Sequence, residues 1–208
     1  MAIATYAQLQ AAAANWLVRA DLTARIPEFI TLAEARLNRL LRTRLAETEI
    51  PLAVTVGGRS VPLPAGFTEP LRVWIERGGV RDELPFLEAS LIGASSLRGA
   101  PGAWTVDGDR LAFDRPCDQA YALTLRMLQA FALSDIAPTN ALLSEAPDVY
   151  LFATLSEAGP FLRDADLAGV YESKLSRAIG ELNAKDARSR APWTLVTELP
   201  DLVPARGL

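Results

Sequence analysis

Hydrophobic residues on both sides of the middle of the chain recur at the spacing of one face of a helix. In the N-terminal part, this pattern predicts a helix that begins at Thr5, whose hydroxyl is expected to cap it, and a second helix over 26–44. In the C-terminal part, it predicts a helix from Pro147 to about Phe161 and another after Asp164, whose side chain is expected to cap it. The chain therefore carries one pair of predicted helices on each side of its middle part.

The middle of the chain has a different pattern, in which apolar and polar residues alternate as they do in β-strands. Turn signals interrupt this alternation and predict β-hairpins at Gly57-Gly58, at Gly78-Gly79 and at Asp107-Gly108-Asp109. A longer strand is expected over 120–131 and a short helix over 86–99. This part of the chain is therefore predicted to form a curled sheet or a sandwich.

The expected fold is α+β and mainly α, namely a four-helix bundle with a small β-rich insert and an extended C-terminal arm. Its parts are expected to be an N-terminal helix pair (1–47), the β-rich insert (48–132), a C-terminal helix pair (133–187) and the arm (188–208). The two helix pairs would bury their apolar stripes against each other. The expected bundle core consists of Trp16, Phe29, Ile30, Leu37, Leu151, Leu155, Tyr171 and Leu175.

The C-terminal arm is apolar but is interrupted by prolines. Pro192, Pro200 and Pro204 exclude a helix across this segment. An extended apolar terminus usually packs on a surface, either on its own domain or on a neighbouring molecule. The candidate docking residues of the arm are Trp193, Leu195, Val196, Leu199, Leu202 and Val203.

The charge of the chain is modest but locally concentrated. A formal net charge of −4 argues against nonspecific binding of nucleic acid over the whole surface, although it permits a local basic patch. Arginines gather on the second predicted helix, at Arg36, Arg39, Arg42 and Arg44. Two interpretations remain open: a solvated helix face paired with nearby glutamates, or a basic face that meets an acidic partner or DNA.

Residues suited to catalysis or metal binding are scarce. The chain has no histidine and one cysteine, Cys117, so the commonest general base and a cysteine-rich metal site are excluded. Asp107 and Asp109 flank a glycine, which favours a hairpin turn over a cation site. No catalytic residue, cofactor site or metal site is therefore expected, and the chain is predicted not to be an enzyme. No signal peptide and no membrane span are expected either.

Several segments of the sequence, taken in their order along the chain, resemble a known protein family. They are "TYAQLQAAAANWLVRADLTARIPEFITLAEARLNRLLR", "VPLPAGFTEPLRVWI", "LAFDRP", "APTNALLSEAPDVYLFATLSEA" and "YESKLSRAIGELN". This succession, over about residues 5–185, resembles the head-to-tail adaptor (connector) proteins of tailed bacteriophages and gene transfer agents. No single segment is a catalytic signature, and the arm from Ala191 onward matches only in character.

The resemblance implies a structural protein of the virion neck, made in the host cytoplasm. It implies a homo-oligomeric, twelve-fold ring under the portal protein, with a tail or neck protein below. DNA would pass through the ring without sequence-specific binding, and the arm would dock on the portal. The four arginines of the second predicted helix would then face either a neighbouring subunit or the channel.

Two alternatives to the adaptor remain. The first is another neck or tail-completion protein with a similar bundle, which would bind a different partner. The second is a small-ligand-binding or enzymatic domain that uses the β insert as a pocket, which would be stabilised by its ligand.

Overall fold

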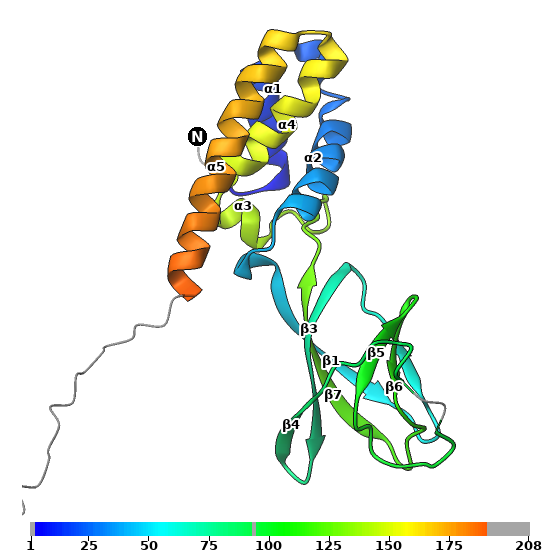
Figure 1. Ribbon diagram of the computed structural model, residues 1–208. Coiled ribbons are helices and arrows are strands. Elements are labelled where there is room, and N and C mark those ends of the chain that lie inside the picture. Colours follow the sequence, from blue (N-terminus) through cyan, green and yellow to red (C-terminus); the bar gives the residue numbers. More distant parts are fainter. Residues whose placement is uncertain (1–2, 93–94, 191–208) are drawn as a thin grey trace, which may run out of the picture.

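The computed structural model describes residues 3–92 and 95–190, which form a helical lobe and a β lobe (Figure 1). The chain starts in the helical lobe, passes through the whole β lobe and returns to the helical lobe. Each lobe has its own cluster of buried hydrophobic residues. The predicted division into four parts is not tested by these observations and stays a prediction.

The helical lobe combines elements from both ends of the chain. Its helices are α1 (Tyr6–Leu17), α2 (Ile26–Leu40), α3 (Ala141–Glu145), α4 (Pro147–Leu162) and α5 (Ala165–Arg190), with 3-10 turns η1 (Ala20–Leu22) and η2 (Arg44–Ala46). The Thr5 hydroxyl caps α1 by accepting a hydrogen bond from the Gln8 N–H, at 3.3 Å. Asp164 caps α5 in the same way through the Leu167 N–H, at 2.9 Å. Both caps confirm the sequence prediction.

The predicted fold class, a mainly α fold built on a four-helix bundle of two helix pairs, is wrong. The described residues form an α+β fold with five α-helices and two antiparallel sheets. Within the helical lobe, α1, α2 and α5 all pack against α4, and α1 and α2 contact each other only slightly. The reason lies in α4 itself, which is apolar or small on almost every side and therefore becomes a buried central helix.

Close approach between α4 and α5 depends on a glycine. A Cβ atom placed on Gly159 would lie 2.6 Å from the Cβ of Ala168, which is far inside van der Waals contact.

Helix α2 also differs from its prediction, because it ends at Leu40 and not at residue 44. Leu41 and Ala46 beyond it are buried in the helical core, so tertiary packing overrides the local helix propensity.

The β lobe is a sandwich of two antiparallel sheets. Its strands are β1 (Glu47–Val54), β2 (Ser60–Pro62), β3 (Phe67–Arg77), β4 (Val80–Leu84), β5 (Trp104–Asp107), β6 (Arg110–Phe113) and β7 (Tyr121–Gln129). One sheet has the order β1-β7-β3-β4 and the other the order β2-β6-β5. Side chains of both sheets share one buried cluster. The predicted long strand is confirmed as β7, which lies between β1 and β3.

Two of the three predicted hairpins are confirmed. Gly78 and Gly79, both at positive φ, connect β3 to β4, and Gly108 at φ 58° lies in the turn between β5 and β6. The hairpin predicted at Gly57-Gly58 is wrong, because β1 pairs with β7 while β2 pairs with β6. The glycine pair instead lies where the chain changes from one sheet to the other. The short helix predicted over 86–99 is also absent from its described residues.

Candidate interaction surfaces

The connection between the lobes is clamped by one asparagine. The side-chain amide of Asn38, near the end of α2, donates to the carbonyl oxygen of Phe131 at 2.9 Å. Its side-chain oxygen accepts from the N–H of the same residue at 2.8 Å. Phe131 follows β7, so this pair of hydrogen bonds fixes the chain where it leaves the β lobe. Phe131 belongs to the buried cluster of the helical lobe, so these bonds hold the returning chain against the end of α2.

A buried polar network lies beside this clamp. The Asn140 amide donates to the Tyr150 hydroxyl at 2.7 Å, and that hydroxyl donates to Glu34 Oε1 at 3.3 Å. Glu34 is only 9% exposed, and burial raises its pKa to about 7, while hydrogen bonds from the Leu133 backbone and Tyr150 act in the opposite direction. The network connects α2, α3 and α4 through side chains that sequence reasoning did not single out.

The signal for Glu34 was present in the sequence. Glu34 follows Ile30 by four residues and precedes Leu37 by three, so it lies on the same stripe of α2 as two buried residues. An acidic residue on a buried stripe predicts a hydrogen-bonded carboxyl group in the core. Asn140 was also detectable, because it precedes the apolar residues of α3, where its side chain accepts from the Leu143 N–H at 2.8 Å.

Arg36, one of the four predicted basic residues, ties three helices together. Its Nη2 lies 2.5 Å from Glu172 Oε1 on α5, and its Nη1 lies 3.6 Å from Glu157 Oε1 on α4. The hydrogen bond with Glu172 is the main cause that raises the pKa of Arg36. An external partner of Arg36 would have to compete with these internal ion pairs.

The other three predicted arginines lie in different surroundings. Arg42 Nη2 is 3.3 Å from Glu69 Oε2 on β3, which adds an ion pair across the junction of the lobes. Arg44 Nη1 donates to the carbonyl oxygen of Ser189 at 3.1 Å, near the end of α5. Arg39 is exposed on α2 and makes no ion pair within the described part of the chain. A role between subunits or towards the channel stays a prediction for all four.

The residues predicted for the bundle core occupy two kinds of position. Those buried in the helical lobe are Phe29, Ile30, Leu37, Leu151, Leu155 and Leu175. Tyr171 is half-buried, and Trp16 is 46% exposed, so Trp16 is not a core residue of this chain. The Trp16 ring lies 6.1 Å from the Tyr171 ring and 5.9 Å from the Phe152 ring, as measured between centroids. These three rings form an aromatic cluster at the edge of the core.

The predicted docking residues of the arm lie outside the described residues. Helix α5 continues to Arg190 and so includes the first positions assigned to the arm. Nothing in the structure tests the docking assignment of Trp193, Leu195, Val196, Leu199, Leu202 and Val203, which stays a prediction.

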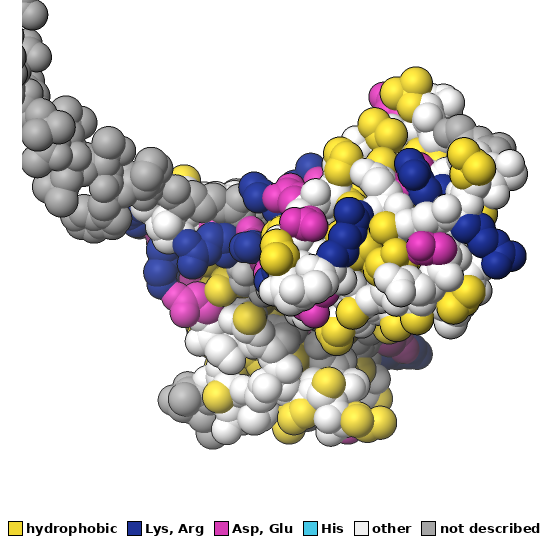
Figure 2. All heavy atoms as spheres, turned by 90° about the horizontal axis from the view of Figure 1, so that it is seen from below, with side chains coloured by type: hydrophobic (Ala, Val, Ile, Leu, Met, Phe, Trp, Pro, Cys, Tyr) yellow, Lys and Arg dark blue, Asp and Glu magenta, His cyan; other side chains and the backbone are white. Residues whose placement is uncertain are grey.

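Exposed hydrophobic side chains mark several parts of the surface. In the helical lobe they include Leu32 and Leu40 on α2 and Val170 on α5. Figure 2 shows hydrophobic side chains spread over the face seen from below, with arginine, lysine and acidic side chains between them. Apolar side chains scattered in this way are normal on a protein surface, so they do not by themselves define a contact site.

The loop between β4 and β5, residues 85–103, presents some of these side chains. Leu91 is 66% exposed and Leu97 is 76% exposed. The Phe86 ring packs edge-on against the Trp104 ring, with the centroids 4.9 Å apart. The Trp104 indole N–H donates to the carbonyl oxygen of Leu84 at 2.9 Å. The start of this loop is therefore fixed to the sandwich.

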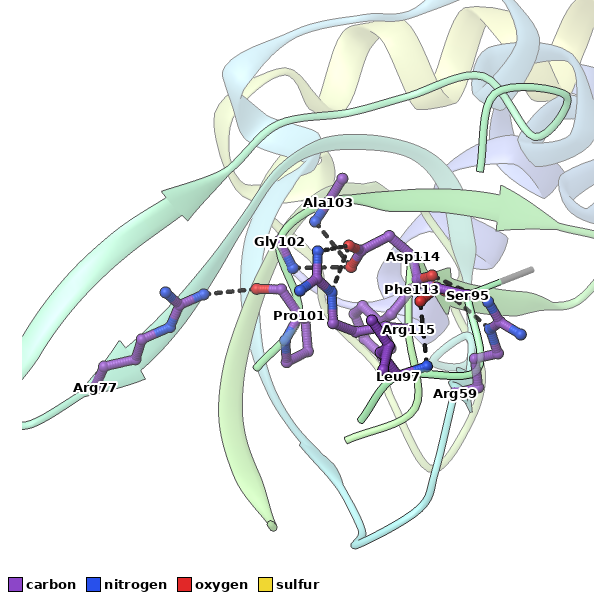
Figure 3. Close-up of polar contacts among 10 residues, drawn as sticks. All are labelled: Arg59, Arg77, Ser95, Leu97, Pro101, Gly102, Ala103, Phe113, Asp114 and Arg115. Carbon is purple, nitrogen blue, oxygen red and sulfur yellow. Dashed lines mark hydrogen bonds and ion pairs between the residues drawn. The ribbon is translucent and has the colours of Figure 1, made fainter. Parts of the chain in front are cut away.

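The other end of the 85–103 loop is held by Asp114 (Figure 3). Its Oδ1 accepts from the N–H groups of Gly102 at 2.8 Å and Ala103 at 3.3 Å, and its Oδ2 lies 2.7 Å from Arg115 Nη2. Burial opposes ionisation of Asp114, but these hydrogen bonds outweigh it and lower the pKa. Arg77 also donates to the carbonyl oxygen of Pro101 at 2.6 Å. Both ends of the loop are thus fixed to the sandwich, and the exposed Leu91 and Leu97 lie between these ends.

The structure offers little for catalysis. Within residues 3–92 and 95–190, no group of three or more metal-binding side chains comes together. Cys117 is buried in the sandwich, and burial raises the pKa of its thiol, which disfavours a reactive thiolate. No helix in the described ranges combines the length and the apolar character that a membrane span requires.

Comparison with known proteins identifies the family. A family model described as SU10 adaptor protein matches residues 4–196 of the 208 residues. The chain therefore belongs to the SU10 adaptor protein family, a family of phage head–tail adaptors, and the resemblance inferred from the sequence is confirmed. No curated protein matches the chain. Membership of this family implies a bacteriophage structural adaptor with a non-enzymatic role.

Proposed function

We propose that this protein forms a twelve-fold ring beneath the portal in the neck of a tailed phage. The ring extends the DNA channel and offers its lower surface to tail or neck proteins. The observation that carries this proposal is the family match over residues 4–196. The protein is made in the host cytoplasm, and DNA slides through the ring without sequence-specific contacts.

The build of the protomer supports a ring. A ring subunit needs two different lateral faces that fit each other, and it needs a rigid body so that the rotation closes. The Asn38 clamp connects α2 to the segment after β7, and the Arg42–Glu69 ion pair connects the residues after α2 to β3. Exposed apolar side chains on α2, on α5 and on the 85–103 loop offer separate contact surfaces.

The C-terminal arm is the proposed attachment to the portal. An apolar chain segment restricted by prolines loses less conformational entropy on binding than a flexible segment does. Because α5 includes the residues up to Arg190, the attachment is proposed for residues 191–208. Its apolar side chains would fill pockets on the portal, as extended peptides do when they add to a protein surface.

Sedimentation velocity of the protein, alone and mixed with the portal ring from the same genome, tests the adaptor function. We expect a light species alone and stoichiometric occupancy of the portal in the mixture. A chain that ends at Arg190 should keep its melting temperature within a few degrees but should no longer sediment with the portal. Val80→Ser, at the exposed turn between β3 and β4, is the matched control and should still bind.

Two outcomes would overturn parts of this proposal. Full binding by the chain that ends at Arg190 would exclude the arm as the portal attachment. A full-length protein that ignores the portal would favour the alternative of another neck or tail-completion protein. In that case, a ligand-dependent rise in melting temperature would point to a pocket in the β lobe instead.

A further inference from the structure

Ile136 is the most exposed large hydrophobic side chain in the described part of the protein, at 96%. It lies in a tight turn, residues 134–137. The Ser134 N–H donates to the Ala137 carbonyl oxygen at 3.0 Å, and the Ala137 N–H donates to the Ser134 hydroxyl at 3.0 Å. Turns favour glycine, proline, asparagine, aspartate and serine, so the turn itself does not call for an isoleucine.

The turn is attached to the helical lobe on both sides. Before it, Leu133 belongs to the buried helical cluster. After it, the Pro138 carbonyl oxygen accepts a hydrogen bond from the Tyr6 N–H, at the start of α1, at 2.7 Å. A partner that binds Ile136 would therefore meet a positioned side chain, and little conformational entropy would be lost on binding.

A pocket of about 260 Å³, which we call the junction pocket, lies between the end of α2 and strand β3. Its apolar lining consists of buried side chains, namely Leu41, Ala46, Leu128 and Phe131. Its polar lining includes Asn38, Arg39, Arg42, Thr68 and Glu69. A pocket that combines buried apolar side chains with a few polar groups suits an apolar side chain that has a charged neighbour.

Contacts within the chain hold the walls of the junction pocket. The Arg42–Glu69 ion pair, at 3.3 Å, connects the wall on the α2 side to β3. The Asn38 clamp holds Phe131, which is part of the apolar lining, against the end of α2. The junction pocket is therefore formed before any partner binds.

The charges beside Ile136 and at the junction pocket are complementary. Asp135 precedes Ile136, is exposed and makes no ion pair within the described part of the chain. Arg39 of the junction pocket is also exposed and likewise has no ion pair there. Because Arg42 is paired with Glu69, the pocket keeps the positive charge of Arg39. A carboxylate beside an apolar side chain thus matches an arginine beside an apolar surface.

The turn and the junction pocket belong to different sides of the connection between the lobes. Ala137 of the turn lines a cavity together with Glu47 and Thr48 of β1. The junction pocket is lined instead by Thr68 and Glu69 of β3. Strand β7 lies between β1 and β3 in the sheet. A contact that is passed from one copy to the next needs two such separate surfaces.

We propose that Ile136 of one chain enters the junction pocket of a second copy of this chain, where Asp135 pairs with the second copy's Arg39. The two surfaces differ, so the contact is heterologous and repeats from copy to copy. The inference rests on the proposed ring and names one of its lateral contacts. One side chain and one ion pair bind weakly, so free chains stay apart at low concentration, and the portal assembles them by holding many copies together.

Cross-linking of free, full-length chains at high concentration tests this contact without the portal. One protein carries Ile136→Cys and the other Thr68→Cys, and a short bismaleimide joins thiols that come together. Cys117 is buried and is kept in both proteins. We expect this mixture to cross-link about tenfold faster than Ile136→Cys mixed with Val80→Cys, a control at another exposed position. Equal rates in the two mixtures would overturn the proposal.

A charge exchange shows whether Asp135 meets Arg39. Adding Asp135→Arg to the first protein, or Arg39→Asp to the second, should slow the cross-link roughly two- to fivefold. Both changes together should restore the original rate, because the ion pair is rebuilt with its charges exchanged. Melting temperatures equal to that of the parent protein show that each variant is folded. A doubly exchanged mixture as slow as the single ones would contradict the pairing and overturn the proposal as stated.

Sedimentation with the portal separates failure of this contact from failure of the adaptor function. Portal binding without the cross-link would overturn the lateral contact and leave the adaptor function in place. The cross-link without portal binding would support the contact and contradict the adaptor function. If the cross-link is absent and Ile136→Ser abolishes portal binding, Ile136 docks on the portal and not on a second copy.

Discussion

The two lobes stabilise themselves by different means. The described part of the chain has five buried polar residues, and only Thr105 lies in the β lobe. The other four lie in the helical lobe or in the segment between α2 and β1, namely Glu34, Thr43, Thr154 and Ser156. The β lobe encloses a core formed almost wholly of apolar side chains. Because the pKa of Glu34 is raised to about 7, the stability of the helical lobe should depend on pH in the neutral range. The lowered pKa of Asp114 restricts the corresponding effect in the β lobe to acidic pH.

The largest effect should come from matched truncations in the two cores. Phe29→Ala in the helical lobe and Phe113→Ala in the β lobe each remove a buried ring and should each cost about 3–5 kcal/mol. Urea unfolding followed by circular dichroism and by tryptophan fluorescence measures both. If the lobes unfold together, both probes shift equally in each variant. If the urea midpoint of either variant equals that of the parent protein, the replaced ring is not part of a core.

The second largest effect should be the pH dependence of stability, which should differ between the two lobes. The pKa of Glu34 is raised to about 7 in the folded protein, above its ordinary value of 4.5. Between these two values the folded chain keeps a proton that the unfolded chain releases, so stability falls as pH rises towards 7. The shift corresponds to a loss on the order of 3 kcal/mol by pH 8, relative to pH 4.

Glu34→Gln should remove most of this loss, because a glutamine stays neutral across the same range. Urea midpoints at pH 5 and pH 8 measure the difference between the variant and the parent. Glu28→Gln changes an exposed carboxylate on the same helix and is the matched control. Equal pH dependence in Glu34→Gln and the parent would show that Glu34 is not the titrating group.

The clamp between the lobes should have a somewhat smaller effect. Asn38→Ala leaves the N–H and the carbonyl of Phe131 without their partner and should cost about 1–3 kcal/mol. Hydrogen exchange at the Phe131 amide should accelerate, and the two spectroscopic probes of unfolding should begin to separate. Asn183→Ala, on the exposed face of α5, should change neither measurement.

Ion pairs should give the smallest effects, and these should again differ between the lobes. Arg36→Ala breaks two partly buried pairs in the helical lobe and should cost about 1 kcal/mol. Arg72→Ala breaks the exposed pair with Glu83 in the β lobe and should cost less than about 0.5 kcal/mol. A double-mutant cycle of Arg36 with Glu172, in low and high salt, measures the first pair. A coupling energy of zero would show that this pair does not hold α5.

Local signals in the sequence predicted much of the secondary structure. The Thr5 and Asp164 caps, helix α4 and strand β7 follow from residues that act on their immediate neighbours. The double glycine of the β3–β4 turn permits the positive φ values that such a turn requires. Each of these features can be recognised in a short stretch of the chain.

Long-range pairing could not be predicted in this way. Nothing near Gly57 shows that β1 pairs with β7, more than sixty residues further along, and not with β2. The central position of α4 likewise depends on three partner helices. Asn38 resembles any polar residue near a helix end, and its role becomes visible only when Phe131 lies beside it.

The sequence segments that resemble the family also give less information about function than about the internal structure of the chain. Glu34, Asn38, Asn140 and Tyr150 all lie in those segments, and all are hydrogen-bonded within this chain. The arginines of the same segments are mostly paired internally as well. The surfaces that would meet other proteins were harder to predict, because exposed leucines such as Leu97 have no distinctive local pattern.

Because β1 pairs with β7, the β lobe could be removed or replaced as one unit. The chain enters the lobe on β1 and leaves it on β7, and these neighbouring antiparallel strands place Glu47 opposite Leu128. A protein engineer could cut both strands at this level and join them by a short turn, because the cut ends are already side by side. The same two ends could accept a foreign domain, whose orientation the helical lobe would then determine.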